Sequence, residues 1–248
     1  MRGVRLTTVV IAMLFCLVPA QMLAGTLLVN QVTPYLGYGY GLGYWTGMTG
    51  GLNTAFGAGN VTVSASPLTN LGYMLGFDRL WITARQPFGQ SLSATEIANL
   101  AAFIATGRRV VLTGENSAWT AWNNSILSAV GGSYLGPDTS ATLTPSVAHP
   151  VTAGITALNT AADGIATGGT SLFSQNVVTL WGANVISLLS VNVIDDTNGA
   201  GPGNTLFKSN LANWLAGGGG AGIPEPTTWL LVGAGLTLLG TIRRRARR

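Results

Sequence analysis

Polar residues that could carry chemistry follow an apolar run in the middle of the chain. Residues 109–113 predict a strand, and Glu115, Asn116 and Ser117 come directly after it. Ligands of open α/β sheets bind beyond the carboxyl ends of the strands. A carboxylate there can act as a general acid or base, bind sugar hydroxyls, or accept backbone N–H groups of the helix that follows. We therefore treat Glu115, Asn116 and Ser117 as candidate ligand-binding residues, together with His149, Asp195 and Asp196.

A second acidic pair follows another apolar run. Asp195 and Asp196 come after residues 185–194, which predict a strand, so we expect them to face Glu115 across the same edge of the sheet. Because calcium prefers oxygen ligands, one interpretation of this loop is a calcium site. Its ligands would be Asp195, Asp196, Asn198 and Asn204. The loop lacks the spacing of an EF-hand, which favours the other interpretation, a solvated turn.

His149 is the only histidine and Cys16 the only cysteine. One histidine excludes a multi-histidine metal site. A Ser-His-acid triad would have to combine His149 with Ser117, but Ser117 lacks the G-x-S-x-G pattern. The alternative for His149 is a local role in the turn before Pro150. Cys16 falls in the expected signal peptide, so the mature chain has no thiol nucleophile or disulfide. No cofactor is predicted.

The composition favours an exported protein. Charged residues make up 8% of the 248 residues, against about 25% in an ordinary soluble domain, and Gly contributes 35. Of the 12 Lys and Arg residues, seven lie in residues 2–5 and 243–248, which leaves residues 25–222 with a net charge of −2. A phosphate-binding surface needs clustered cations. Apart from the Arg108–Arg109 pair the body has no such cluster, so we exclude nucleic acid as a partner.

The N-terminus has the pattern of a secretory signal peptide over residues 1–24, which we expect to form an N-terminal signal helix. Arg2 and Arg5 precede an apolar run at residues 6–18, which is too short to span a bilayer comfortably. We favour cleavage by signal peptidase after Ala24, with Ala20 as the second site. A retained anchor is the alternative. Export through the inner membrane is therefore the predicted route.

The C-terminus has three parts in a fixed order. A Gly-rich linker at residues 217–222 leads to a Pro-Glu-Pro motif, an apolar segment at 227–242 and an arginine cluster. A helix of that length reaches about 24 Å, short of the roughly 30 Å hydrocarbon core, which snorkelling arginines can partly offset. We predict a single transmembrane helix whose arginines stay cytoplasmic, so that the body lies outside.

This arrangement, at residues 223–248, resembles the PEP-CTERM sorting signal of Gram-negative bacteria. The matching residues are Pro224, Glu225, Pro226, Arg243, Arg244, Arg245, Arg247 and Arg248. The resemblance implies recognition by an exosortase-type membrane protease, removal of the helix, and release to the cell surface or extracellular matrix. A permanent single-span anchor without processing is the alternative.

The body, residues 25–216, alternates strand and helix patterns. Strands are predicted at 27–32, 61–63, 77–83, 109–113, 177–180 and 185–194, and helices at 93–107, 118–130 and 206–215. Ser93 and Glu96 form a capping box at the first of these helices. The alternation predicts an α/β fold with a mostly parallel open sheet and helices on both faces.

The body also resembles a class I glutamine-amidotransferase-like, flavodoxin-like domain. The resemblance rests on residues 77–82, 93–107, 108–112 and the His-Pro segment at 149–155. The glutaminase members of that family place a cysteine nucleophile at the turn after a central strand. The corresponding turn here, residues 114–117, reads Gly-Glu-Asn-Ser, so amidotransferase chemistry is excluded.

Glycines and aromatic residues interleave between Tyr35 and Trp45. Such a segment suits stacking on sugar rings or self-association at a surface, or it simply packs onto the sheet, which we favour. We expect a non-catalytic surface or matrix protein with a structural or glycan-binding role, its partner an exopolysaccharide or another matrix polymer. The alternatives are a secreted hydrolase using Glu115 with Asp195 or Asp196, and a tethered periplasmic ligand-binding domain.

Overall fold

The computed structural model describes residues 25–57, 59–138 and 142–217. The expected signal peptide (1–24), nearly all of the linker (217–222) and the expected sorting signal (223–248) lie outside the described residues, and so do the two helices expected at the chain ends. No helix within the described ranges is long and apolar enough to cross a membrane.

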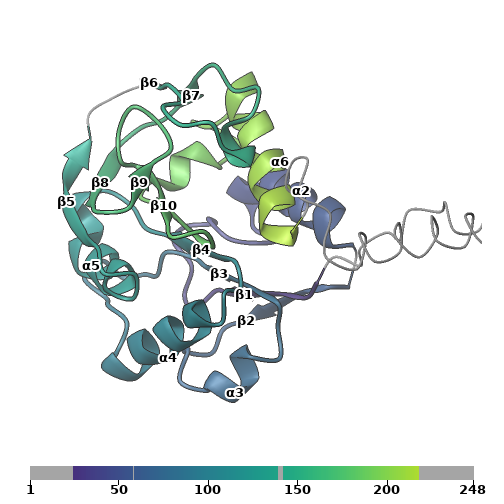
Figure 1. Cartoon of the computed structure of the whole chain (residues 1–248), viewed down its shortest axis with the longest axis vertical. Coiled ribbons are helices and arrows are strands. Elements are labelled where there is room, and N and C mark those ends of the chain that lie inside the picture. Colours follow the sequence, from purple (N-terminus) through teal and green to yellow (C-terminus); the bar gives the residue numbers. More distant parts are fainter. Residues whose placement is uncertain (1–24, 58, 139–141, 218–248) are drawn as a thin grey trace, which may run out of the picture.

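A seven-stranded sheet forms the centre of the body (Figure 1). Its strands lie in the order β2 (Val61–Ser64), β1 (Leu27–Asn30), β3 (Arg79–Ile82), β4 (Val110–Thr113), β11 (Val185–Leu188), β10 (Val178–Trp181) and β9 (Thr170–Ser171). The first five run parallel, β10 is antiparallel to β11, and β9 is antiparallel to β10. The predicted α/β fold with a mostly parallel sheet is confirmed.

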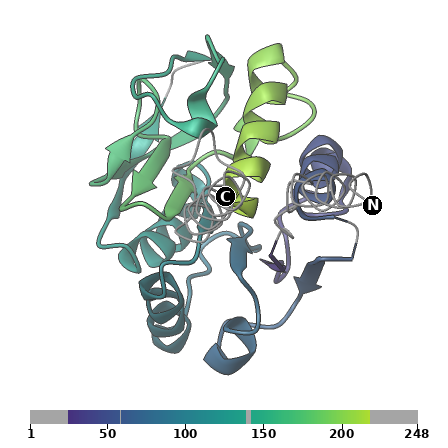
Figure 2. The same ribbon diagram turned by 45° about the vertical axis from the view of Figure 1, so that its right-hand side comes forward.

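Helices cover both faces of this sheet (Figures 1 and 2). One face packs on α2 (Thr46–Phe56) and α6 (Pro202–Ala216), and the other on α3 (Leu71–Met74), α4 (Ala94–Ala105) and α5 (Thr120–Ser128). Side chains alternate between the two cores because successive residues of a strand point to opposite faces. Trp81 belongs to the core under α2 and α6, while its neighbours Leu80 and Ile82 belong to the other.

The chain between β4 and β11 departs from the prediction. The apolar run 185–194 is not one strand, because β11 ends at Leu188 and a 3-10 helix, η4 (Val191–Val193), begins where Ser190 accepts the N–H of Asn192. Two antiparallel pairs that the sequence did not indicate lie beside the main sheet. They are β5 (Ser133–Asp138) with β8 (Asp163–Thr167), and β6 (Thr142–Leu143) with β7 (Leu158–Asn159).

A buried ion pair ties the start of α4 to the sheet. The predicted capping box is present: Ser93 Oγ accepts the N–H of Glu96, and Glu96 Oε2 accepts the N–H of Ser93. Glu96 Oε1 also accepts from Arg85 Nη2 at 2.8 Å and from the N–H of Leu68. Arg85 in turn donates to Asn30 Oδ1 at the end of β1. Both charges are about 95% buried, so each depends on the other for its solvation.

Candidate functional site

Glu115 lies at the carboxyl end of β4, as predicted, but its side chain points inward. Only 2% of the residue is exposed. Its Oε2 accepts the N–H of Val191 at 2.7 Å, and its Oε1 accepts from Asn116 Nδ2 at 3.2 Å. Asn123 fixes the backbone of the turn by bonding both the N–H and the carbonyl of Glu115. The carboxyl group therefore joins β4 to the segment after β11.

Glu115 does not cap the helix that follows, which was one interpretation of its position. Asn116 does so, since its Oδ1 accepts the N–H of Ala118 at 3.0 Å at the start of η2 (Ser117–Trp119). Ser117 is exposed at the first residue of η2. The non-glycine residues with positive φ among the described residues are Thr33, Leu36 and Ala162, so this turn is not a strained nucleophile elbow.

Three carboxyl groups share the region beneath this turn. Burial is the main cause that raises the pKa of Glu115 to about 8. The hydrogen bonds from Val191 and Asn116 lower this pKa, and the charges of Asp163 and Asp195 contribute to raising it. Asp163, at the start of β8, and Asp195, after η4, are both fully buried. Tyr38 lies beside the group, and its pKa is raised to about 12 by burial and by the charges of Asp195 and Glu115.

Asp195 holds a turn. Its Oδ1 accepts the N–H groups of Thr197 at 3.1 Å and Gly199 at 2.6 Å, and its Oδ2 accepts from Thr197 Oγ1 and Asn198 Nδ2. These donors satisfy both oxygens of the Asp195 side chain within its own loop. The structure therefore brings Asp195 near Glu115 as expected, but in a structural arrangement.

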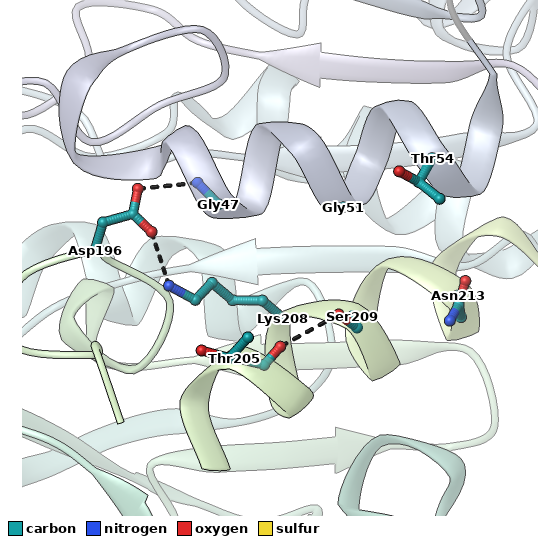
Figure 3. A pocket seen from close by; sticks show the side chains of 8 residues that line it. All are labelled: Gly47, Gly51, Thr54, Asp196, Thr205, Lys208, Ser209 and Asn213. Atoms are coloured by element: carbon teal, nitrogen blue, oxygen red, sulfur yellow. Dashed lines mark hydrogen bonds and ion pairs between the residues drawn. The ribbon is translucent and has the colours of Figure 1, made fainter. Parts of the chain in front are cut away.

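Asp196 points elsewhere, contrary to the expectation that both aspartates face Glu115. It lies in a groove of about 330 Å³ between α2 and α6 (Figure 3). Lys208 Nζ bonds Asp196 Oδ1 at 2.8 Å and the carbonyl of Asp195 at 2.7 Å, and Asp196 Oδ2 accepts the N–H of Gly47 at 2.9 Å. A Cβ at Gly47 would lie 2.6 Å from Asp196 Oδ1, so a larger residue there would displace this carboxylate. The pair fastens the 195–196 segment to both helices.

The four residues of the calcium interpretation do not converge. Asn204 Oδ1 accepts the N–H of Asn159, and Asn198 bonds Asn192 and Asp195 through its amide nitrogen. Asp195 and Asp196 are engaged by the donors described above. In residues 25–57, 59–138 and 142–217, no group of three or more His, Cys, Asp or Glu residues could hold a metal ion.

His149 lies away from Glu115 and Ser117. Its Nδ1 accepts the N–H of Val151 at 3.2 Å and caps η3 (Pro150–Thr152), which agrees with the local role. The ring is 6.2 Å from that of Trp214, and Trp214 contacts Arg109. Burial and then the charge of Arg109 lower the pKa of His149. Arg109 directly precedes β4, whereas Glu115 follows it. His149, on the Arg109 side, therefore lies near the opposite end of β4 from Glu115.

Aromatic rings gather at the same carboxyl edge, above the buried carboxyl groups. Tyr38 stacks between Tyr35, at 5.2 Å, and Tyr44, at 4.9 Å. Phe88 continues the row at 6.1 Å from Tyr35, and Trp119 supports both Tyr35 and Phe88 edge-on. A Cβ at Gly37 would lie 3.2 Å from the Tyr44 ring, and φ there is +90°, so the glycine allows the loop to hold this ring. The segment thus packs onto the sheet, as favoured.

The two ends of this aromatic row nevertheless reach solvent. Phe88 is 58% exposed and Tyr44 is 41% exposed. We call Tyr44, Tyr38, Tyr35 and Phe88 the aromatic row. Phe88, Asp163 and Lys208 were not singled out from the sequence. An aromatic residue in the Gln-Pro-Phe-Gly loop after a predicted strand was the available signal for Phe88, whereas Asp163 depends on the β5–β8 pair, which has no local signature.

The strand order defines a flavodoxin-like α/β fold, and the turn after β4 holds no cysteine. No family model and no curated protein matches the chain. Among solved structures, the chain is similar to the mmIFT52 N-terminal domain, with a TM-score of 0.55 and 11% identity over 77% of this chain and 97% of that one.

Two further structures share the fold. A protein described as ThuA-like, from Bacteroides uniformis, has a TM-score of 0.52 and 11% identity over 80% of this chain and 94% of that one. A protein described as a GMP synthase component, from Thermoplasma acidophilum, has a TM-score of 0.51 and 10% identity over 78% of this chain and 95% of that one. At these identities the likeness establishes the fold alone.

Proposed function

We propose that this chain is an exported bacterial protein, sorted by an exosortase to the cell surface or extracellular matrix, whose α/β body binds a neutral polysaccharide without hydrolysing it. The aromatic row carries the proposal. It lies at the carboxyl edge of the parallel sheet, where ligands of such folds bind. Exposed rings present flat apolar faces to sugars, and tyrosine hydroxyls add hydrogen-bonding groups.

The row favours an extended ligand over a single sugar. Both faces of Tyr38 are covered by Tyr35 and Tyr44, so the exposed surface is concentrated at Phe88 and Tyr44. A ligand that contacts both must extend along the row. The acidic groups nearby are buried, and Arg85 is 4% exposed, so the described part of this edge presents no exposed cation to an acidic polymer. This chemistry suits an uncharged oligosaccharide segment.

The carboxyl groups support a non-catalytic role. A general acid or nucleophile must come within hydrogen-bond reach of the substrate. Glu115 is 2% exposed and both its oxygens accept hydrogen bonds, Asp195 is fully buried, and Asp196 pairs with Lys208. A secreted hydrolase that uses Glu115 as a general acid is the second candidate. The pKa of about 8 favours it because the group would carry a proton at neutral pH.

Polysaccharide binding is tested by affinity electrophoresis of the protein through gels containing the neutral exopolysaccharide of its host. We expect retardation of the wild type and, for Tyr44→Ala and Phe88→Ala, about tenfold weaker binding, equivalent to about 1.4 kcal/mol for a lost ring contact. Tyr73→Ala is the matched control, because Tyr73 is 47% exposed but lies on α3. Equal binding by all variants, or none by the wild type, would refute the proposal.

Sorting is tested by the intact mass of the protein recovered from its host. We expect a chain that begins near Gly25 and lacks Arg243 to Arg248, found outside the cell. A membrane-bound chain that still carries the arginines would instead indicate a tethered domain.

Hydrolysis is tested separately, by measuring the release of reducing sugar from the polysaccharide. The second candidate would be established if the wild type releases reducing sugar and Glu115→Gln abolishes this release while it still binds.

A further inference from the structure

β2 forms one edge of the seven-stranded sheet and pairs only with β1. The N–H of Leu27 donates to the carbonyl of Asn60 at 2.9 Å, and the N–H of Gln31 donates to the carbonyl of Ser64 at 2.8 Å. Successive residues of a strand direct their N–H and C=O groups to opposite sides. Val61 and Val63 therefore direct theirs away from β1, and no other described residue bonds these groups.

This edge lacks the features that normally prevent strand pairing. Edge strands are usually protected by charged side chains, proline, bulges or very short length. β2 reads Val-Thr-Val-Ser, is paired to β1 without a bulge over all four residues, and has Val63 44% exposed. The opposite edge of the sheet, β9, has two residues and is protected by its length.

We propose that β2 is a self-association surface, on which a second copy of this chain adds its own β2 in antiparallel orientation across a two-fold axis. The proposal does not rest on polysaccharide binding, because β2 is separate from the aromatic row. The second copy is the favoured occupant because the edge is complementary to itself. It has no charge to repel its image, and its outward groups alternate in the pattern that an antiparallel partner requires.

The hydrogen-bond pattern fixes the register. Only Val61 and Val63 have outward groups, so they must form the hydrogen-bonded pairs: Val61 of one copy opposite Val63 of the other, and the reverse. Thr62 then lies opposite Thr62 of the second copy, as a non-hydrogen-bonded pair on the axis, with Cα atoms about 4.5 Å apart. Threonine pairs at such positions are favourable. Two sheets become one continuous sheet through a small contact, which we expect to be weak in dilute solution.

A single cysteine can trap this contact. In the full chain with Cys16→Ser, Thr62→Cys places the only thiol at the axis, where the Cα separation suits a disulfide. Under mild oxidation we expect a disulfide-linked dimer on non-reducing electrophoresis. The matched control is Thr170→Cys on β9, an exposed threonine at the other edge, for which we expect cross-linking at least tenfold slower.

Val63→Lys added to the Thr62→Cys chain tests the pairing itself. The lysine introduces a charge at an exposed edge position and should reduce cross-linking at least tenfold while circular dichroism shows an unchanged fold. The proposal is overturned if cysteines at 62 and 170 cross-link equally fast, if the cysteine at 62 does not cross-link, or if Val63→Lys leaves its rate unchanged.

Discussion

Glu115→Gln should be about 4 kcal/mol more stable than the wild type at about pH 9, and about 1 kcal/mol less stable at about pH 4, where only the lost hydrogen bond counts. The folded protein holds the Glu115 proton up to a pKa of about 8, whereas the unfolded chain releases it near the ordinary value of 4.5. Between these values the folded state binds the extra proton, so the stability of the wild type falls as pH rises through that range and is fully reduced above it. Glutamine has no such proton to lose.

The free energy of unfolding, measured by urea denaturation at several pH values, checks this prediction. Glutamine keeps an oxygen to accept the N–H of Val191, and the loss of the bond from Asn116 Nδ2 costs about 1 kcal/mol, which is included in the expected gain. If Glu115→Gln destabilises the protein at every pH, the carboxylate is ionised and contributes favourably in the folded state, opposite to what its burial requires.

Glu96→Gln should show the opposite pH dependence and lower the free energy of unfolding by about 3 kcal/mol at neutral pH. Burial raises the pKa of Glu96, but the hydrogen bond and charge of Arg85, with the N–H groups of Ser93 and Leu68, lower it to a net value below 4.5. The stabilisation by this carboxylate is therefore present above pH 4.5 and lost as pH falls through its folded pKa. In the variant, Arg85 is left as a buried charge without its counterion.

The double variant Arg85→Met with Glu96→Gln provides the control. It removes the buried cation together with its partner, and we expect it to regain more than half of the lost stability. If the double variant is less stable than Glu96→Gln alone, the contacts of Arg85 with Asn30 and the Trp122 ring, rather than its charge, dominate its contribution.

The elements that could be predicted are those specified locally. The strand at β4 is a compact β-branched run, and α4 carries its own capping box at Ser93. α2 is not among the predicted helices, because Gly47, Gly50 and Gly51 lower its helix propensity and packing against α6 must stabilise it. The β5–β8 pair depends on contacts with residues far away in the chain, which no local pattern reveals.

The candidate site also combines features that the local sequence specifies with features that depend on distant residues. Sequence position places Glu115 at the end of β4, but the direction of its side chain depends on Val191, 76 residues further along. That N–H is available because the strand ends at Leu188 and Ser190 starts a 3-10 turn. Asp195 and Asp196 are adjacent in the chain, yet their side chains have different partners. Asp195 accepts the N–H of Gly199, and Asp196 pairs with Lys208.

The position of α6 has a consequence for synthesis of the chain from its amino end. α6 comes last among the described elements, yet it packs against α2, and the bond from Gly47 to Asp196 spans 149 residues. Until α6 is made, the apolar side chains of α2, Met48, Leu52 and Phe56, have no helix to cover them. Contacts this distant in sequence form slowly. The core beneath α2 and α6 therefore cannot be completed until nearly the whole body has been synthesised.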